Sequence, residues 1–330
     1  MKSKIFIFTT LLLVLIFSSC EKTIDFNGNI PNPVLVMNCI ALPDSTLKVN
    51  LTRSKFFLSN NNQGYTTVDN AVVTATINET LKINLKTTGN GNYEDNYKPK
   101  PNDIIRIDAS APTLESIWAE VKVAPRVTII SIDTTWVKIE DQNGYGTSSI
   151  YNYTGDSIIG NSYSAEIKIR IKFQDNASEQ NYYRLNTYSG QGFYNNYNNY
   201  YSIDYNDIVF GNSTDQGVST DIIGSVTYGN NYFTDELING KEYSLSINTV
   251  IMKSVYFPGK APKGGIETRS ELTIDLQQLS KSYYLYQKTK FASISSDPIL
   301  SEPVQIFSNI NGGIGILASY TSSNIVTISL

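Results

Sequence analysis

The 330-residue sequence contains no histidine. Ser-His-Asp and Cys-His nucleophilic sites, His-ligated zinc and imidazole acid–base catalysis all depend on that side chain. Its absence removes most hydrolase and metalloenzyme classes. Carboxylate-pair chemistry of the glycosidase kind and Ser-Lys arrangements survive this test, and neither has a local signature here. We therefore expect a non-catalytic protein with no catalytic residue, no cofactor and no metal ion.

The sequence also has few cysteines and no excess of positive charge. The only cysteines are Cys20 and Cys39, and Cys39 stands in the apolar stretch Val34–Ile40, which favours an inert core thiol. If Cys20 carries lipid, the mature chain cannot form an internal disulfide. The 26 Lys and Arg residues are outnumbered by 30 Asp and Glu residues, giving a net charge of -4. No basic surface is expected, so nucleic-acid binding is excluded as a function.

Long apolar runs are missing except at the start of the chain. There, Ile5–Phe17 follows two lysines and precedes Ser18-Ser19-Cys20. A basic start, an apolar run and small residues before a cysteine are typical of a bacterial lipoprotein signal. At about 13 residues the run is too short to cross a bilayer as a permanent helix. We predict a signal peptide over 1–19, a lipidated Cys20, and a tether over 20–33 that holds the protein on a membrane.

The residues that are abundant favour β-structure. Tyr, Thr, Ile and Val recur with period-two alternation, and Asn-Gly and Gly-Asn pairs interrupt them at short intervals. Between Val34 and Val123 we predict seven short strands, with a turn at Gly89–Asn92, which matches an immunoglobulin-like sandwich over 34–125. The strands are centred on Val36, Val49, Val73, Ile83, Tyr93, Ile105 and Val121. We expect Trp118 to pack at the edge of this core.

The remainder, 126–330, is predicted to be a larger β-rich domain with one short helix. Glu166–Phe173 alternates apolar and charged residues, as a half-buried strand does. Asn239-Gly240 predicts a type I′ hairpin between strands at Tyr232 and Tyr243. Ser280 is placed to cap a helix that follows it. The predicted fold class is therefore all-β, with strands making up most of the chain beside the one short helix.

Several blocks of this sequence resemble one family of proteins. They are the leader ending Ser19-Cys20-Glu21-Lys22, Val68–Val73, Phe173–Leu185, Phe233–Lys241 and Glu302–Gly315. Together they are similar to the Bacteroidota lipoprotein family known as domain of unknown function 4249. The resemblance implies an outer-membrane lipoprotein and a TonB-dependent outer-membrane receptor as partner, with an accessory role in nutrient uptake. It implies no catalytic residues.

Two kinds of segment are candidates for recognition or chemistry. The tract Gly190–Tyr201 is rich in Tyr and Asn, a combination used in binding loops, and a solvated insertion is the alternative interpretation. Its candidate binding residues are Tyr194, Tyr197, Tyr200 and Tyr201. Asp235-Glu236 would supply half of a carboxylate pair, but neighbours on a strand point to opposite faces, so we expect solvated turn residues. Asp141–Gly144 begins like a calcium loop and lacks its later glutamate.

The sequence therefore predicts a lipid-anchored, non-catalytic protein of the outer membrane that binds a ligand or assists a TonB-dependent transporter. A cell-surface structural or adhesion protein is one alternative. A carboxylate-dependent glycosidase is another, and it requires two buried carboxyl groups about 5 to 10 Å apart in a cleft.

Overall fold

The first nine strands form two facing sheets. The computed structural model describes residues 28, 31–56, 65–141, 150–151, 157–190, 203–210, 231–257, 266–267, 271–295 and 304–329. All elements below lie in one unit made of Val34–Ser54 and Tyr65–Leu330. The strands are β1 (Leu35–Ala41), β2 (Leu47–Arg53), β3 (Thr66–Thr67), β4 (Val72–Ile77), β5 (Leu81–Asn84), β6 (Lys86–Gly89), β7 (Asn92–Asp95), β8 (Ile104–Ser110) and β9 (Ile117–Lys122). Each of the seven strands predicted from the sequence is confirmed.

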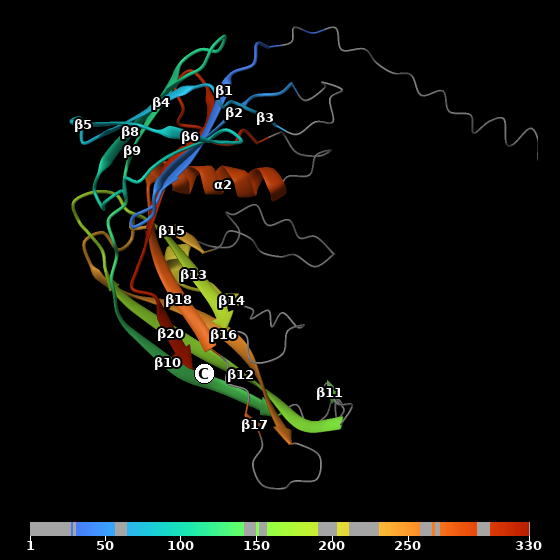
Figure 1. Cartoon of the computed structure of the whole chain (residues 1–330). Coiled ribbons are helices and arrows are strands. Elements are labelled where there is room, and N and C mark those ends of the chain that lie inside the picture. The colour runs from blue at the N-terminus through green and yellow to red at the C-terminus, as the bar shows by residue number, and fades with distance from the viewer. Residues whose placement is uncertain are drawn as a thin grey trace, which may run out of the picture. The chain divides into compact units, whose positions relative to one another are not determined.

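The sandwich core lies between a sheet in the order β5-β4-β8-β9 and the β1-β2-β7-β6 part of a larger sheet (Figure 1). Alternate residues of each strand point into it, as in β9, where Ile117, Ala119 and Val121 are buried between exposed neighbours. Trp118 faces outward and is 39% exposed, with the Arg106 guanidinium 4.1 Å from its ring centroid. The expectation that Trp118 packs at the core edge is therefore wrong, because the strand's alternation turns it to the outer face.

A strand from the far end of the chain completes the sandwich. β19 (Ile314–Ser322) pairs with β1 in parallel, from Val36 opposite Ile314 to Ala41 opposite Ser319. Leu317 of β19, like Ile310 before it, belongs to the same buried cluster as the core of residues 35–123. The core of the predicted sandwich thus includes residues from beyond position 125.

The rest of the chain forms two further sheet layers. One is β10 (Ile129–Asp141), β12 (Ser157–Gln174), β16 (Glu242–Phe257) and β14 (Ile203–Asp204), with β11 (Ile150–Tyr151) on β12 and β17 (Ile266–Glu267) on β16. The other is β15 (Tyr232–Thr234), β13 (Tyr182–Gly190) and β18 (Glu271–Leu279), which continues into β19 and also pairs with β20 (Val326–Ser329). The predicted alternation of β12 is confirmed, because Ile167, Ile169, Ile171 and Phe173 are fully buried.

The Asn239-Gly240 pair makes a turn but not the predicted hairpin. β15, which precedes it, pairs with β13, whereas β16, which follows it, pairs with β12. The turn closes through a 2.8 Å hydrogen bond from the Lys241 amide to the Ile238 carbonyl, and Gly240 alone has a positive φ, of 71°. A type I′ turn needs positive φ at both central residues. The turn therefore carries the chain from one sheet to another.

The predicted helix is confirmed as α2 (Lys281–Ser295). A short 3-10 turn, η1 (Ile208–Phe210), lies earlier in the chain, between β14 and β15. Ser280 caps α2: its Oγ accepts the Tyr283 amide at 3.2 Å, and its carbonyl accepts the Tyr284 amide at 3.1 Å. The helix packs against β19 and β13. Within the described residues, no helix has the length and apolar character needed to cross a membrane. The chain is mainly β, as the sequence predicts.

Candidate functional site

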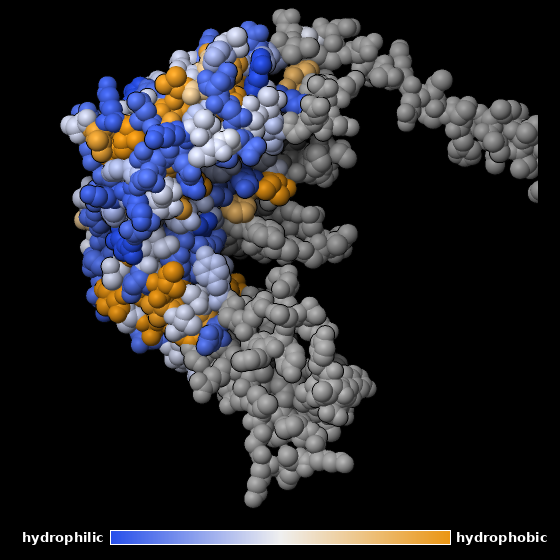
Figure 2. Space-filling view, viewed as in Figure 1, coloured by the Kyte–Doolittle hydropathy of each residue, from blue (hydrophilic) through white to orange (hydrophobic). Residues whose placement is uncertain are grey.

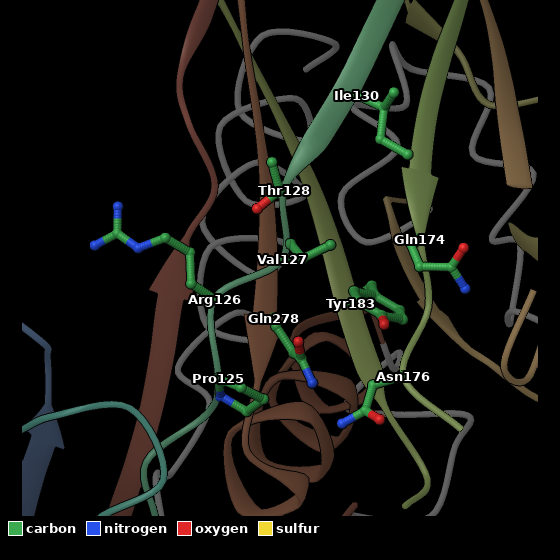
Figure 3. A pocket seen from close by; sticks show the side chains of 9 residues that line it. All are labelled: Pro125, Arg126, Val127, Thr128, Ile130, Gln174, Asn176, Tyr183 and Gln278. Carbon is green, nitrogen blue, oxygen red and sulfur yellow. The ribbon is translucent and has the colours of Figure 1, made fainter. Parts of the chain in front are cut away.

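Two adjoining cavities lie where the sandwich meets the second half of the chain. The smaller, of about 230 Å³, is lined by Pro125 and the residues that follow it up to Ile130, and by residues of β12, β13 and β18 (Figure 3). The larger, of about 760 Å³, lies between β9, the segment 179–182 and the start of α2, and we call it the junction groove. Pro125 and Gln278 line both cavities. A volume of about 760 Å³ is within the usual range for small-molecule sites.

Ser319 of β19 holds two walls of the junction groove in place. Its Oγ accepts the Ala124 amide at 3.3 Å, which fixes the linker after β9. Its backbone exchanges two bonds with Ser280, from the Ser280 amide to the Ser319 carbonyl at 2.8 Å and from the Ser319 amide to the Ser280 Oγ at 3.0 Å. On the third side, the Lys122 ammonium pairs with the Glu179 carboxylate at 2.7 Å. The groove is therefore built from segments that are far apart in the sequence.

Asn181 is the hydrogen-bonding hub behind the groove. It is 2% exposed, and its Nδ2 donates to the carbonyls of Asn176 at 2.6 Å and Glu179 at 2.9 Å, and to Asp235 Oδ2 at 3.1 Å. Its Oδ1 accepts from Gln278 Nε2 at 2.5 Å. One buried amide thus shapes the 176–181 loop and orients Gln278 toward both cavities.

Removing the Asn181 side chain should destabilise the fold strongly. We expect Asn181→Ala to lower the free energy of unfolding by roughly 2 to 3 kcal/mol, because buried partners lose their hydrogen bonds without gaining water. Urea unfolding of wild type and variant measures the difference. The matched control is Asn84→Ala, at an exposed position on β5, which should change stability by less than about 0.5 kcal/mol. Equal midpoints for Asn181→Ala and wild type would show that the hub does not stabilise the fold.

Two buried carboxylates lie beside the hub. Asp175 accepts the Tyr183 hydroxyl at 2.5 Å and the Gly240 amide at 2.7 Å, while Asp235 accepts the Asn181 amide at 2.9 Å. Burial raises the pKa of Asp175, the two hydrogen bonds oppose that rise, and the nearby Asp235 adds to it. Burial and the hydrogen bond to Asp175 also raise the pKa of Tyr183. The expected solvated position is wrong for Asp235, which is 1% exposed, because its carboxylate satisfies buried amides; Glu236 is exposed as predicted.

These carboxylates accept hydrogen bonds from backbone amides of nearby turns. Neither Asp175 nor Asp235 lines the smaller cavity or the junction groove. Their oxygens accept hydrogen bonds from protein donors. Among the described residues, no group of three or more Cys, Asp or Glu side chains is placed to hold a metal ion.

Several residues predicted as sites lie outside the part of the chain that the structure describes. They are Cys20, Tyr194, Tyr197, Tyr200 and Tyr201. In the segment Asp141–Gly144, only Asp141 is described, at the end of β10. The groove residues Asn181, Gln278 and Lys281 were not predicted. No local motif marks them, because their proximity depends on β19 and β18 rather than on spacing.

Comparison with known protein families adds one finding. The family model described as Domain of unknown function (DUF4249) matches residues 21–325. The chain belongs to this family. The DUF4249 match begins directly after Cys20 and includes every residue that lines the junction groove. No curated protein matches the chain.

Proposed function

We propose that this DUF4249 protein is a non-catalytic binding protein of the outer membrane, anchored through lipid on Cys20 and acting beside a TonB-dependent nutrient transporter. The lipoprotein leader in the sequence supports the anchor. That the chain is a lipoprotein of Bacteroidota is part of the same proposal. The observation that carries the binding role is the junction groove of about 760 Å³.

The lining of the groove is suited to holding a polar organic ligand. Side-chain amides of Gln180, Asn181, Gln278 and Asn309 stand beside the apolar side chains of Leu285 and other residues. A few oriented polar groups on an apolar wall are typical of ligand sites. Figure 2 shows apolar residues in separate groups among hydrophilic ones on the visible face, so a groove is a better candidate for recognition than one broad apolar surface.

The alternatives differ in what they require. The glycosidase alternative receives no support from Asp175 and Asp235, since neither lines a cavity described above. An adhesion protein would co-purify with a filament or matrix component. A transport accessory would instead co-purify with a TonB-dependent receptor from detergent-solubilised outer membrane, which mass spectrometry identifies.

Obstructing the groove tests the binding role directly. Lys281 is exposed at the first position of α2 and lines the groove, whereas Lys290 is exposed on the same helix and does not. We expect Lys281→Trp to reduce the small molecules retained by the purified protein at least about tenfold, because the indole fills the opening and contact with the ligand is lost. Mass spectrometry of denatured samples measures retention.

Lys290→Trp is the matched control and should retain the same molecules as wild type. If both tryptophan variants retain wild-type amounts, the groove is not the binding site and the proposal fails.

A further inference from the structure

The free edge of β9 forms one wall of the junction groove. β9 ends the sheet order β5-β4-β8-β9, so β8 covers one of its two edges. In an antiparallel pair, alternate residues turn their N–H and C=O groups toward the partner strand, and the residues between them turn theirs away. The Val123 amide donates to the Asp103 carbonyl at 2.8 Å, which places Val121 and Val123 among the residues that face β8. Glu120 and Lys122 therefore turn their backbone groups away from β8, and both residues line the groove.

One contact on this edge shows how another segment of chain pairs with it. Trp118 has the same backbone orientation as Glu120 and Lys122. Its amide donates to the Asn311 carbonyl at 3.1 Å, and its carbonyl accepts the Asn311 amide at 2.8 Å. This antiparallel bridge occupies the place of a next strand beside β9. Among the described residues, the backbone groups of Glu120 and Lys122 have no such partner.

The segment that makes this bridge then leaves the edge of β9. Two residues before Asn311, the Asn309 side chain is bound to the Leu317 backbone at 2.8 and 2.9 Å. The Phe307 amide, two residues earlier still, donates to Thr289 Oγ1 at 2.9 Å. Asn309 and Phe307 both line the junction groove, so the groove opens where this segment turns from β9 toward β19 and α2.

The open stretch of β9 is closed at both ends. At one end, the Ala124 amide donates to Ser319 Oγ at 3.3 Å, and the Ala124 carbonyl accepts from Thr321 Oγ1 at 2.6 Å. At the other end stands the bridge made by Trp118. From Trp118 to Ala124 an extended chain rises about 20 Å, at about 3.3 Å per residue. A single short segment therefore fits this stretch, whereas the edge of another folded sheet does not.

The groove offers this segment both backbone and side-chain contacts. An extended peptide carries N–H and C=O groups at the spacing that Glu120 and Lys122 present, and main-chain hydrogen bonds supply the affinity when a peptide adds to a sheet edge. Leu279, Leu285 and Phe307 add apolar surface to the lining, on which peptide side chains can pack. The chemistry of the groove thus favours a peptide over a ligand without a peptide backbone.

We infer that a short extended peptide binds in the junction groove as an added strand beside β9. Over about three residues, its backbone exchanges hydrogen bonds with the amides and carbonyls of Glu120 and Lys122, and its side chains contact Leu285 and Phe307. This inference rests on the proposed binding function and adds the chemical class of its ligand.

The test uses a tetrapeptide of alternating valine and threonine, acetylated at one end and amidated at the other, together with analogues N-methylated at one backbone amide at a time. Calorimetric titration of the full mature protein measures binding. Methylation of an amide that faces β9 should weaken binding at least about tenfold, and methylation of the next amide should change it less than about twofold. The reason is that neighbouring amides of an extended strand point to opposite edges. Equal effects at neighbouring amides would overturn the inference.

A proline variant tests the edge from the side of the protein. Lys122→Pro removes a backbone donor that faces the groove and should weaken peptide binding about tenfold. Lys82→Pro is the matched control, at an exposed lysine of β5 on the opposite edge of the same sheet. The Leu85 amide donates to the Val73 carbonyl, so the Lys82 amide also points away from its partner strand. Lys82→Pro should bind the peptide like wild type, and thermal melts check that both variants are folded.

Lys122→Ala separates the backbone amide from the side chain. It keeps the N–H group but removes the ion pair with Glu179, and its peptide affinity should stay within about threefold of wild type. Equal losses in Lys122→Ala and Lys122→Pro would assign the effect to the ion pair and overturn the inference. If no peptide binds while Lys281→Trp still removes a retained molecule, the peptide assignment is wrong and the groove remains a binding site. If Lys281→Trp removes nothing, the proposed function itself fails.

Discussion

Replacing Gly315 by alanine is expected to destabilise the protein by roughly 3 to 5 kcal/mol, which is exceptional for adding one methyl group. Gly315 is the second residue of β19 and has a φ of 118°, a conformation that L side chains rarely adopt. A Cβ atom at this position would lie only 2.0 Å from the Met37 carbonyl oxygen of β1. The backbone of one strand must therefore move, and the parallel pairing of β19 with β1 is lost or distorted.

Gly89→Ala is the matched control for this substitution. Gly89 also has a positive φ, of 90°, but a Cβ atom there meets nothing within 4 Å. Gly89→Ala should lower the free energy of unfolding by only about 1 kcal/mol, because the alanine must adopt a positive φ but meets no clash. Denaturant unfolding of both variants separates the two causes. Similar losses in the two variants would show that the close approach of β19 to β1 contributes nothing.

The effect of Gly315→Ala should extend to the junction groove. Ser319, four residues along β19, fixes both the Ala124 linker and the Ser280 cap. We therefore expect the variant to bind ligand less well even under conditions where it remains folded. The strand that completes the sandwich is also the strand that positions the candidate site.

Local patterns explain why most strands were predictable from the sequence. The alternation at Val49, Ile105 and Ile167 places one side of each strand in a core, and period-two patterns carry that information directly. The Ser280 cap was predictable for a similar reason, since capping depends on residues within one helical turn.

No local pattern in the sequence specifies which distant segments pair with each other. Gly312–Gly315 reads as a turn before a strand, but nothing in it specifies that Ile314 lies opposite Val36. The Asn239-Gly240 pair predicts a hairpin because the turn chemistry is local, whereas the choice of β13 as partner for β15 is made by the cores on either side. Asp235 looked like a solvated turn residue because its buried partner, Asn181, is 54 positions away.

The candidate site was the least predictable part for the same reason. Glu120, Glu179, Gln278 and Lys281 come from three separate regions of the chain and form one groove only after β18 and β19 are placed. The Tyr/Asn tract around Tyr194, by contrast, is conspicuous in the sequence, and its role in recognition stays a prediction because it lies outside the described residues.

Removing the lipid attachment site is expected to release the protein from the membrane completely. The leader places Cys20 at the predicted cleavage point, and several acyl chains hold a processed lipoprotein stably where a single chain does not. With Cys20→Ser combined with an ordinary secretory leader, the mature chain should be folded and appear in the soluble extracytoplasmic fraction.

Cys39→Ala in the natural leader background is the control for loss of a thiol. Cys39 is 2% exposed, and burial raises the pKa of its thiol to about 12, so it is protonated and unreactive at neutral pH. This variant should stay in the membrane fraction and lose only modest stability, about 1 kcal/mol, because one buried sulfur is removed. Fractionation in high salt followed by immunoblotting measures both variants. Retention of the Cys20 variant in the membrane under these conditions would show that anchoring does not depend on the lipid, since ionic contacts are screened at high salt while burial of acyl chains is not.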